Sequence, residues 1–542
     1  MLKHALLVYS VLSVIVIVAS GWFPKMPFSE RRKQWRIAHA LSTDSSKAAS
    51  AAKPAMSSSV ISAAVVPFST ESGQQSITDH GDTFVTISLD IGSQKIQAIP
   101  DSGSFELYIV DGDDCELELC QPAYKPDDSK RHFEPTNGLS KDIYFGSGAC
   151  GVELSFDSVH VHNEASRSLP STGLIPIWRI VEMDENLANV WGDGQGFQGI
   201  VGLGFKGNLN KETKETLLEE QVVLEAKRKT GMDPTRPGMA SKALFGDVFA
   251  ICLPRGEDAN PVEVLLEEEA SQSEGRLWWG PDAIPALSFL DVPVVGTRHW
   301  TMKIDSAFFK LQDGGDTVHH MCGGPTASPC AALVDSGTSL IAMSPEKISD
   351  IVYNTVVGDL KPDCSNVDDM PDLIFNVGKD KQLVLTPDTY IMKISTTDLP
   401  IMHENNGRVV LEKGKVLNVR PPPANFVTLK GKRENSITYC THAFMETPME
   451  TALVGGTEHE LIILGIPIFR EYTIRFDRKA ETLGFAPHPF GVTCHGNDLM
   501  VGKTGASSSF AETTRHGRRR HFNVRTLGNI RSLVFPDEFA QV

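Results

Sequence analysis

Two copies of one short acidic motif constrain the fold of this chain more than any other feature. Asp101–Ser104 reads Asp-Ser-Gly-Ser and Asp335–Thr338 reads Asp-Ser-Gly-Thr, and each follows a short apolar stretch. Each motif is followed, further along the chain, by an apolar run that ends in glycine. These runs are Gly199–Gly202 in the first half and Ile462–Gly465 in the second. A strand, an acidic turn and a later crossing strand therefore occur twice. This internal repeat predicts two related lobes whose turns face each other.

The spacing of apolar residues favours a mainly β protein. Short apolar runs such as Phe84–Ile91, Ala331–Val334 and Leu461–Leu464 lie between clusters of glycine, proline and aspartate, as β-strands do. The chain has 542 residues and 41% hydrophobic content, enough to bury a large core in more than one domain. The best helix candidate in the body is Lys211–Lys229, which is rich in Glu, Lys and Leu. We therefore expect a mainly β, bilobal fold with a cleft between the lobes.

Charge is distributed unevenly along the chain. Residues 1–60 carry eight Lys and Arg against two Asp and Glu, and residues 489–542 carry seven against four. Subtracting these net charges of +6 and +3 from the total of −17 leaves −26 for the body. A body of this sign argues against nucleic acid as the main partner, because a phosphate binder needs a positive surface. The pattern fits a basic leader that docks on its own protein.

The amino-terminal residues are typical of a secretory signal. Lys3 precedes the uncharged stretch Ala5–Pro24, and Val18–Ser20 supplies small residues for cleavage. An uncleaved signal anchor is the alternative, because the stretch is almost long enough to span a bilayer. We expect entry into the secretory pathway, followed by secretion or residence in an acidic, endosomal-type or secretory organelle. A link to the membrane is expected only if the segment stays uncleaved.

The two acidic motifs supply the groups needed to hydrolyse a peptide bond without a metal or a covalent intermediate. One carboxylate can deprotonate a water molecule while a second, protonated carboxyl polarises the carbonyl. Two adjacent carboxyls cannot both ionise easily, so they share one proton. Each motif alone is also typical of a β-turn, and the repeat decides in favour of a site. Asp101 and Asp335 are the candidate catalytic pair.

The other residues of the two motifs support the carboxyls in this hypothesis. The glycines permit the tight turn that brings the backbone close to the substrate. The serines in the second position offer hydroxyls that can tie the loops together, and the hydroxyls in the fourth position can hydrogen-bond the carboxylates. These residues are Gly103, Gly337, Ser102, Ser336, Ser104 and Thr338.

A series of further motifs follows the acidic turns in a fixed order. They are Ser104–Ile109, Cys115 and Cys120 in C-x4-C spacing, Phe133–Pro135, Asp142–Gly148, Gly202–Phe205, Trp300, Ala332–Asp335, Phe476–Arg478 and Gly484–Pro487. With them, residues 83–487 resemble the pepsin-like aspartic proteases, including the plasmepsin-type enzymes of apicomplexan parasites. The resemblance implies the bilobal pepsin-like fold and an aspartic endopeptidase, made as a zymogen, that needs no cofactor and no metal.

The resemblance assigns Asp142–Gly148 to the flap that covers bound substrate. Phe145, Gly146 and Ser147 fall at its tip, and Tyr108 faces it. The family usually has Tyr at the position of Phe145 and Trp at the position of Tyr108. The usual hydrogen bond between these two side chains is therefore lost here. We expect an apolar lid with a more mobile tip.

Nine cysteines in a protein of the secretory pathway imply disulfides, and the odd number leaves at least one unpaired or intermolecular. The resemblance implies three pairs: Cys115 with Cys120, Cys322 with Cys330, and Cys364 with Cys440. Cys150, Cys252 and Cys494 have no partner in the family. We expect Cys252 to be a buried, inert thiol, since it lies in an apolar strand-like run. Cys150 falls in the flap, where the sequence leaves both a buried and an exposed thiol open, and we expect no redox role for it.

Two functions are compatible with these observations. The first is a pepsin-like aspartic endopeptidase that cleaves polypeptides and has its own leader as an intramolecular inhibitor. The alternative is a catalytically silent protein of the same fold that binds peptides or a partner protein. Pro100, which removes a backbone N–H from a strand that is central in the family, favours the alternative. Both aspartates are present, however, and a silent relative would be expected to lose one.

The predicted domain organisation follows from these assignments. It comprises a signal peptide or signal anchor at 1–24, a basic propeptide or linker at 25–80, an N-terminal catalytic lobe with the flap at 81–290, a C-terminal catalytic lobe at 291–488 and a basic tail at 489–542.

We predict that the leader covers the cleft at neutral pH and that protonation of carboxylates in the body weakens its hold. The Lys and Arg residues between 25 and 53 are the candidates to pair with Asp101 and Asp335. A shortened chain that begins near residue 80 should therefore cleave peptides faster at neutral pH than the full chain does. Equal rates for the two chains would count against inhibition by this segment.

Overall fold

The computed structural model describes much of the chain between residues 72 and 494. The described residues are 72–80, 84–112, 124–136, 138–145, 148–164, 173–184, 187, 197–205, 214–254, 275–310, 318–323, 329–348, 352, 360–361, 364–396, 403–405, 408–410, 437–447, 451–454, 457–487 and 494. The predicted signal segment, most of the basic leader and the tail lie outside these ranges, as do Cys115, Cys120, Gly146 and Ser147. The sites discussed below belong to one compact unit of the chain, which comprises Ala64–Gly138 and Asp142–Val542.

The first lobe is built around the strand that carries the first acidic motif. This strand, β3 (Gln94–Asp101), lies between β2 (Val85–Ile91) and β8 (Gly199–Gly202). β3 and β8 run parallel, with Asp101 opposite Gly202, so the crossing strand predicted for this lobe is confirmed. The other strands are β4 (Leu107–Val110), β5 (Ser140–Phe145), β6 (Gly148–Val161) and β7 (Leu174–Met183).

The second lobe repeats this arrangement around the second motif. β15 (Cys330–Val334) leads into Asp335 and runs parallel to β25 (Thr457–Leu464), with Val334 opposite Leu464. The strand order is β12-β15-β25-β16-β23, and β24 pairs with β25. The additional strands are β12 (Thr301–Ile304), β16 (Ile341–Met343), β23 (Phe444–Glu446) and β24 (Thr451–Val454). The sequence repeat therefore corresponds to a repeat in structure.

Smaller sheets and short helices complete the second lobe. One sheet has the order β14-β13-β17-β18, and two more pair β19 with β22 and β20 with β21. Their strands are β13 (Ser306–Lys310), β14 (Val318–Gly323), β17 (Asp372–Asn376), β18 (Gln382–Leu385), β19 (Ile391–Thr396), β20 (His403–Asn405), β21 (Arg408–Val410) and β22 (Ile437–His442). The helices are α6 (Pro345–Lys347), η6 (Val367–Asp369), α7 (Pro387–Tyr390) and α8 (Ile466–Glu471).

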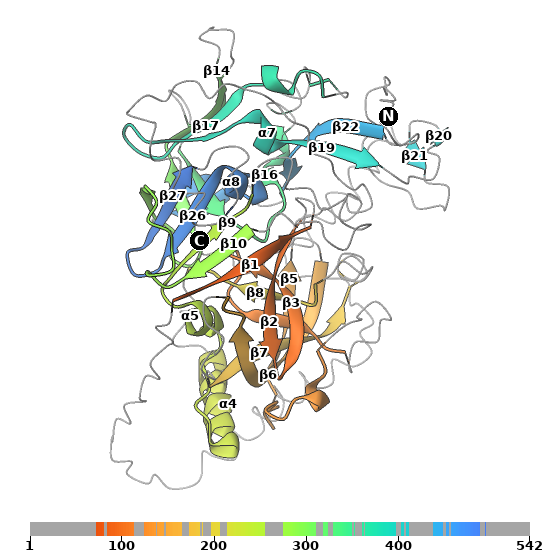
Figure 1. Ribbon diagram of the computed structural model, residues 1–542, viewed down its shortest axis with the longest axis vertical. Helices are drawn as coiled ribbons and strands as arrows, with labels where there is room; N and C mark the ends of the chain where they lie inside the picture. Colours follow the sequence, from red (N-terminus) through yellow and green to blue (C-terminus); the bar gives the residue numbers. More distant parts are fainter. Residues whose placement is uncertain are drawn as a thin grey trace. The chain divides into compact units, whose positions relative to one another are not determined.

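Strands from both predicted halves of the chain form one shared sheet. Its order is β1-β10-β9-β26-β27-β11, all its pairings are antiparallel, and the pairing of β1 with β2 joins it to the first lobe in one 13-stranded sheet. Figure 1 shows β1, β10, β9, β26 and β27. Its strands are β1 (Gly73–Asp79), β9 (Val248–Cys252), β10 (Gly275–Trp279), β11 (Leu290–Pro293), β26 (Tyr472–Asp477) and β27 (Thr482–Pro487). β1 lies inside the segment predicted to be leader. Cleavage at residue 80 would therefore remove a strand from this sheet, whereas cleavage before residue 72 would keep it. The shortened chain used to test inhibition by the leader should therefore begin at residue 72, so that β1 is retained.

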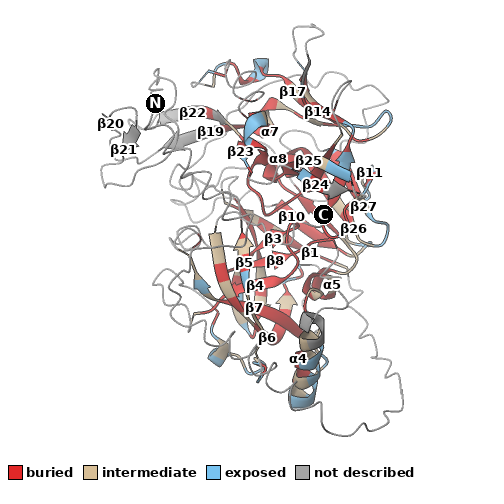
Figure 2. Cartoon of the chain, turned by 180° about the vertical axis from the view of Figure 1, so that it is seen from behind, coloured by how far each residue is buried: buried red, intermediate tan, exposed pale blue. Residues whose placement is uncertain are grey.

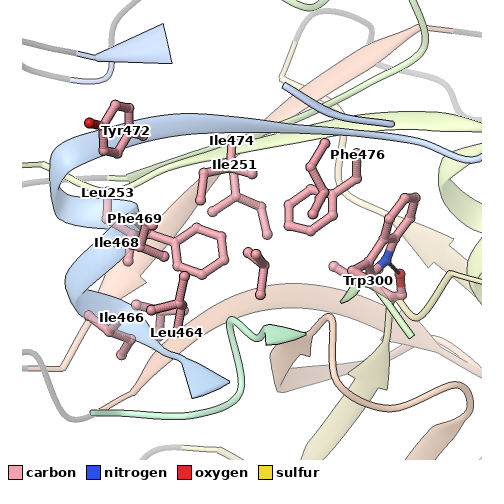
Figure 3. Close-up of a cluster of buried hydrophobic side chains, with 14 of the residues drawn as sticks. Ile251, Leu253, Trp300, Leu464, Ile466, Ile468, Phe469, Tyr472, Ile474 and Phe476 are labelled. Atoms are coloured by element: carbon pink, nitrogen blue, oxygen red, sulfur yellow. Dashed lines mark hydrogen bonds between the residues drawn. The ribbon is translucent and has the colours of Figure 1, made fainter. Parts of the chain in front are cut away.

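An aromatic and aliphatic core lies between the shared sheet and the second lobe. Phe249 of β9 stacks on Phe476 of β26 with ring centroids 4.6 Å apart, and Trp300 meets Phe476 edge-on at 5.1 Å. Ile468 and Phe469 of α8 are fully buried against the same cluster (Figure 3). Burial of large aromatic side chains is a major source of stability, so this core fixes β9 and β26 to the lobe that carries the second motif.

The predicted helix over 211–229 is confirmed as α4 (Lys214–Thr230). Val222 and Ala226, four residues apart, are buried, whereas Leu224 between them is 67% exposed, as one-sided packing of a helix requires. Figure 2 shows the exposed residues along this helix. The other helices of the first lobe are α5 (Ala240–Phe245) and η2 (Pro126–Asp128). None of the helices within the described ranges has the length and apolar character needed to cross a membrane.

The disulfides include two of the pairs that the resemblance implied and one that it did not. Cys322 is bonded to Cys330 and Cys364 to Cys440. Cys252 is bonded to Cys494, with Cα atoms 5.8 Å apart, so the expectation of an inert thiol at Cys252 is wrong. Cys494 lies beyond the last family motif and packs against Trp278, where no sequence pattern indicates a partner. Cys150, whose exposure the sequence left open, is a buried free cysteine with 4% exposure.

We predict that the disulfide between Cys252 and Cys494 stabilises the fold strongly, because it joins residues 242 positions apart. Replacing both cysteines with alanine should lower the free energy of unfolding by about 2–4 kcal/mol, measured by urea unfolding. Cys494→Ala alone should lose a similar amount, since either change opens the same link. A double variant as stable as the wild type would contradict the prediction, as would a non-reduced peptide map that joins Cys252 to another cysteine.

Candidate active site

The two acidic motifs lie at equivalent places in the two lobes. Asp101 ends β3 and Asp335 follows β15, and both side chains are fully buried. The carbonyl of Asp101 accepts a hydrogen bond from the Leu203 N–H at 2.6 Å, and the Asp335 N–H donates to the Leu464 carbonyl at 3.0 Å. Leu203 directly follows β8 and Leu464 ends β25. The backbone of each aspartate is thus hydrogen-bonded to the end of the crossing strand of its own lobe.

Reciprocal serine hydrogen bonds join the two loops. The Ser102 N–H donates to Ser336 Oγ at 3.0 Å, and the Ser336 N–H donates to Ser102 Oγ at 2.9 Å. Each hydroxyl then donates across to the other loop, Ser102 to the Val334 carbonyl at 2.9 Å and Ser336 to the Pro100 carbonyl at 2.6 Å. Two segments more than 200 residues apart in sequence are therefore fixed against each other by four buried hydrogen bonds.

Pro100 does not remove a hydrogen bond between β3 and β8. The carbonyls of Gln97 and Asp101 both accept hydrogen bonds from residues that flank β8, so alternate residues of β3 face that strand and Pro100 faces away. Pro100 faces the side of β3 on which β2 lies, and the pairing between β3 and β2 ends at Ala98. The Pro100 carbonyl there accepts the hydrogen bond from Ser336. The missing N–H of Pro100 therefore lies on the β2 side of β3, where that ladder ends, and the pairing with β8 is kept.

Each motif glycine lies against the carboxyl group of the opposite motif. A methyl group at Gly103 would come within 2.7–2.8 Å of the Asp335 carboxyl, and one at Gly337 would collide with the Asp101 carboxyl. The N–H of Gly103 donates to Asp101 Oδ1 at 2.8 Å, and that of Gly337 donates to Asp335 Oδ1 at 2.9 Å. Only glycine leaves this space, so the two glycines allow the two carboxyls to meet.

Burial raises the pKa of both carboxyls, but their surroundings differ. The pKa of Asp101 is raised well above its usual value, first by burial and then by the charge of Asp335. Burial also raises the pKa of Asp335, but hydrogen bonds from Thr338, Asp101 and backbone N–H groups oppose the rise. Thr338 Oγ1 donates to Asp335 Oδ2 at 2.5 Å. Ser104 lies at the corresponding position beside Asp101 and lowers the pKa of that carboxyl. The environment therefore favours a pair that keeps one proton and one negative charge.

Within the part of the chain that the structure describes, no three His, Cys, Asp or Glu side chains gather in a way that could hold a metal ion. Two adjacent carboxyls that share one proton can act as a general acid and a general base.

Comparison with known proteins assigns the family. The sequence profile described as eukaryotic aspartyl protease matches residues 82–411, which is more than half of the chain. This chain belongs to the eukaryotic aspartyl protease family.

Three relatives indicate how far the likeness extends. Pepsin A of Sus scrofa is 24% identical over 427 residues, which covers 77% of this chain and 84% of that protein. Pepsin-2B of Gadus morhua is 24% identical over 409 residues, or 74% and 94% of the two chains. Cathepsin E of Mus musculus is 25% identical over 319 residues, or 57% and 66%. The likeness thus spans both acidic motifs at low identity.

The candidate flap is formed by the paired strands β5 and β6. Phe145, at the end of β5, lies with its ring centroid 5.6 Å from that of Tyr108 and perpendicular to it. Both side chains are buried, with 5% and 3% exposure. An edge-to-face contact therefore stands where the family usually has a hydrogen bond, and it is an apolar contact of the kind expected from the sequence.

Two residues that the sequence showed only as parts of family motifs support the first loop. Arg478, at the end of β26, donates to the carbonyls of Leu203 and Gly246 at 3.0 and 2.8 Å. Trp300 Nε1 donates to the same Leu203 carbonyl at 2.9 Å. Burial lowers the pKa of Arg478 to about 10, which leaves it charged at neutral pH. The backbone that holds Asp101 is thus braced from the other half of the chain, a role that only long-range contacts reveal.

We predict that Phe145→Ala lowers kcat/KM for peptide cleavage by about threefold to tenfold, because it removes an aromatic contact worth about 0.5–1.5 kcal/mol. Phe145→Tyr keeps the ring and is the matched control. It should leave the free energy of unfolding almost unchanged while altering the ranking of inhibitors that reach the lid. If Phe145→Ala cleaves peptides as well as the wild type does, β5 and β6 are not the flap.

Proposed function

We propose that this protein is an aspartic endopeptidase in which Asp101 and Asp335 act together on a water molecule. The observation that carries the proposal is the packing of each motif glycine against the opposite carboxyl. This packing, together with the reciprocal serine bonds, brings two buried carboxyls together at one point. Family membership supports the same activity, because the matching profile is that of eukaryotic aspartyl proteases.

The surroundings of the pair suggest which carboxyl holds the proton before reaction. Asp335 receives the stronger hydrogen bonding, which stabilises its ionised form, whereas the pKa of Asp101 is raised further. We therefore assign the proton to Asp101 and the negative charge to Asp335. In this assignment Asp335 is the general base and Asp101 the general acid.

The proposed reaction proceeds in two steps with atoms and protons balanced. In the first, Asp335 takes a proton from water, the water oxygen bonds to the substrate carbonyl carbon, and Asp101 gives its proton to the carbonyl oxygen. In the second, the C–N bond breaks, the leaving nitrogen takes the proton held by Asp335, and Asp101 recovers a proton from the tetrahedral intermediate. Both carboxyls return to their starting states, and no covalent bond to the protein forms.

The biological setting belongs to the same proposal. We infer that the protein is made as a zymogen that enters the secretory pathway and works in an acidic compartment, because the pair needs one retained proton. The preferred cleavage sites are between bulky apolar residues, in keeping with the apolar lid at Phe145 and Tyr108. The likeness to plasmepsin-type enzymes rests on motifs alone and is part of this hypothesis.

We predict that Asp101→Asn or Asp335→Asn lowers kcat by at least about 10²- to 10⁴-fold, the size of a general acid or base contribution. The assay is cleavage of a peptide library between pH 4 and 7, with and without a statin-type transition-state mimic. Near wild-type turnover by either variant would show that the pair is wrongly assigned. Peptide binding without cleavage by the wild type would instead support the catalytically silent alternative.

A stability measurement shows whether these variants are folded. A carboxyl whose pKa is raised in the folded state binds a proton more tightly there than in the unfolded chain, so stability falls as pH rises through the raised pKa. Asparagine removes this penalty. The variants should therefore be at least as stable as the wild type at pH 7, and a loss of stability there would point to misfolding as the cause of inactivity.

A further inference from the structure

A carboxyl group that the proposed reaction does not use lies against the candidate flap. Asp184 directly follows β7, where the pairing between β6 and β7 ends. Asp184 Oδ2 accepts a hydrogen bond from the Ala149 N–H at 2.8 Å, and the Asp184 N–H donates to the Ala149 carbonyl at 2.9 Å. The side chain and the backbone of Asp184 therefore hold both backbone groups of the second residue of β6.

The other oxygen of this carboxyl group is bonded to a fixed point of the lobe. Asp184 Oδ1 accepts a hydrogen bond from the Leu187 N–H at 2.8 Å. The side chain of Leu187 is fully buried, so this N–H belongs to a residue that packs in the interior. Because a carboxylate can accept several hydrogen bonds at once, Asp184 joins the start of β6 to the chain that follows β7.

Gly148, the first residue of β6, packs on the same carboxyl group. A methyl group at Gly148 would collide with Asp184 Oδ1 and would lie 2.8 Å from the Leu187 nitrogen. Glycine thus permits the close approach of the carboxyl group to the strand. Two consecutive residues at the start of β6 are therefore held against Asp184.

These contacts complement the contact between Phe145 and Tyr108 on the other strand of the flap. Phe145 ends β5, and its ring packs edge-on against that of Tyr108 in β4. β4 and β6 both pair with β7 (Figure 2). Each strand of the flap is thus attached at the end nearest residues 146 and 147, one through an aromatic ring and the other through Asp184.

We propose that Asp184 is a positioning residue for the flap: its carboxyl group fixes the start of β6 to the end of β7 and keeps the flap in the geometry that holds a bound peptide. The inference rests on the proposed function, in which β5 and β6 cover the substrate. Without this carboxyl group, fewer molecules have the flap in the binding-competent position, and the apparent affinity for peptide falls by the same fraction. Because Asp184 takes no part in the chemistry, the loss falls on KM rather than on kcat.

The test compares Asp184→Ala, Asp184→Asn and a matched control, Glu164→Gln, in the full chain. Alanine removes both acceptors, whereas asparagine keeps the size of the side chain and one acceptor oxygen. Glu164 lies beyond the other end of β6, where its Oε1 accepts hydrogen bonds from the Ser76 N–H and hydroxyl, both at 2.7 Å, and its Oε2 pairs with Arg276. The control therefore changes a carboxyl group that is bonded at least as extensively, at the end of the same strand that is remote from the flap.

We expect Asp184→Ala to raise KM for peptide cleavage by about threefold to tenfold, the effect of one net hydrogen bond, with little change in kcat. The dissociation constant of the statin-type mimic should rise by the same factor. Asp184→Asn should give a smaller rise in both, and Glu164→Gln should leave both unchanged while lowering the free energy of unfolding in urea. A wild-type KM for Asp184→Ala, a loss confined to kcat, or an equal rise in KM for Glu164→Gln overturns the proposal.

Amide hydrogen exchange tests the same contacts without any catalysis. The N–H groups of Ala149 and Leu187 should exchange at least about tenfold faster in Asp184→Ala than in the wild type, as the loss of a hydrogen bond to a carboxylate predicts. Glu164→Gln should leave both rates unchanged, and unchanged rates in Asp184→Ala would overturn the proposal. Asp184→Asn serves for both measurements if the alanine variant does not fold. If the wild type cleaves no peptide, the proposed function fails, and the exchange rates still decide whether Asp184 holds β6.

Discussion

The reciprocal hydrogen bonds between Ser102 and Ser336 are the interaction on which the rest of the site depends. They tie each loop to the backbone of the other through a serine N–H and a serine hydroxyl. Because every donor and acceptor in this junction is buried and used, breaking any part of it would leave a polar group without a partner. Each lobe is thus held to the other at the point where the two carboxyls meet.

The central features of the fold could be predicted because they repeat. A strand, an acidic turn and a glycine-ended strand occur twice, and the structure shows both pairs as parallel neighbours. Asp101 and Asp335 could be selected for the same reason. The effect of Pro100 could not be judged in advance, since it depends on which side of β3 the missing N–H faces. That side follows from the register with β8, which local sequence does not specify.

Long-range partners are the features that the sequence could not supply. The bond between Cys252 and Cys494 joins a strand of the shared sheet to a residue beyond the last family motif, and no spacing rule connects the two. Arg478 and Trp300 were visible as motifs, but their common target is the carbonyl of Leu203. For Arg478 and Trp300 the partner is a backbone carbonyl, which carries no signal of its own in a sequence.

The shared sheet also has a consequence for how the molecule is made. β9 and β10 are synthesised well before β26 and β27, which cover the edge of β9 and complete the sheet. An uncovered strand edge is a template for pairing with other chains, and contacts between such distant segments form slowly. During synthesis the edge of β9 therefore stays uncovered until residues 472–487 have left the ribosome. Until then the open edge of β9 can pair with other chains, a hazard that chaperones counter during synthesis.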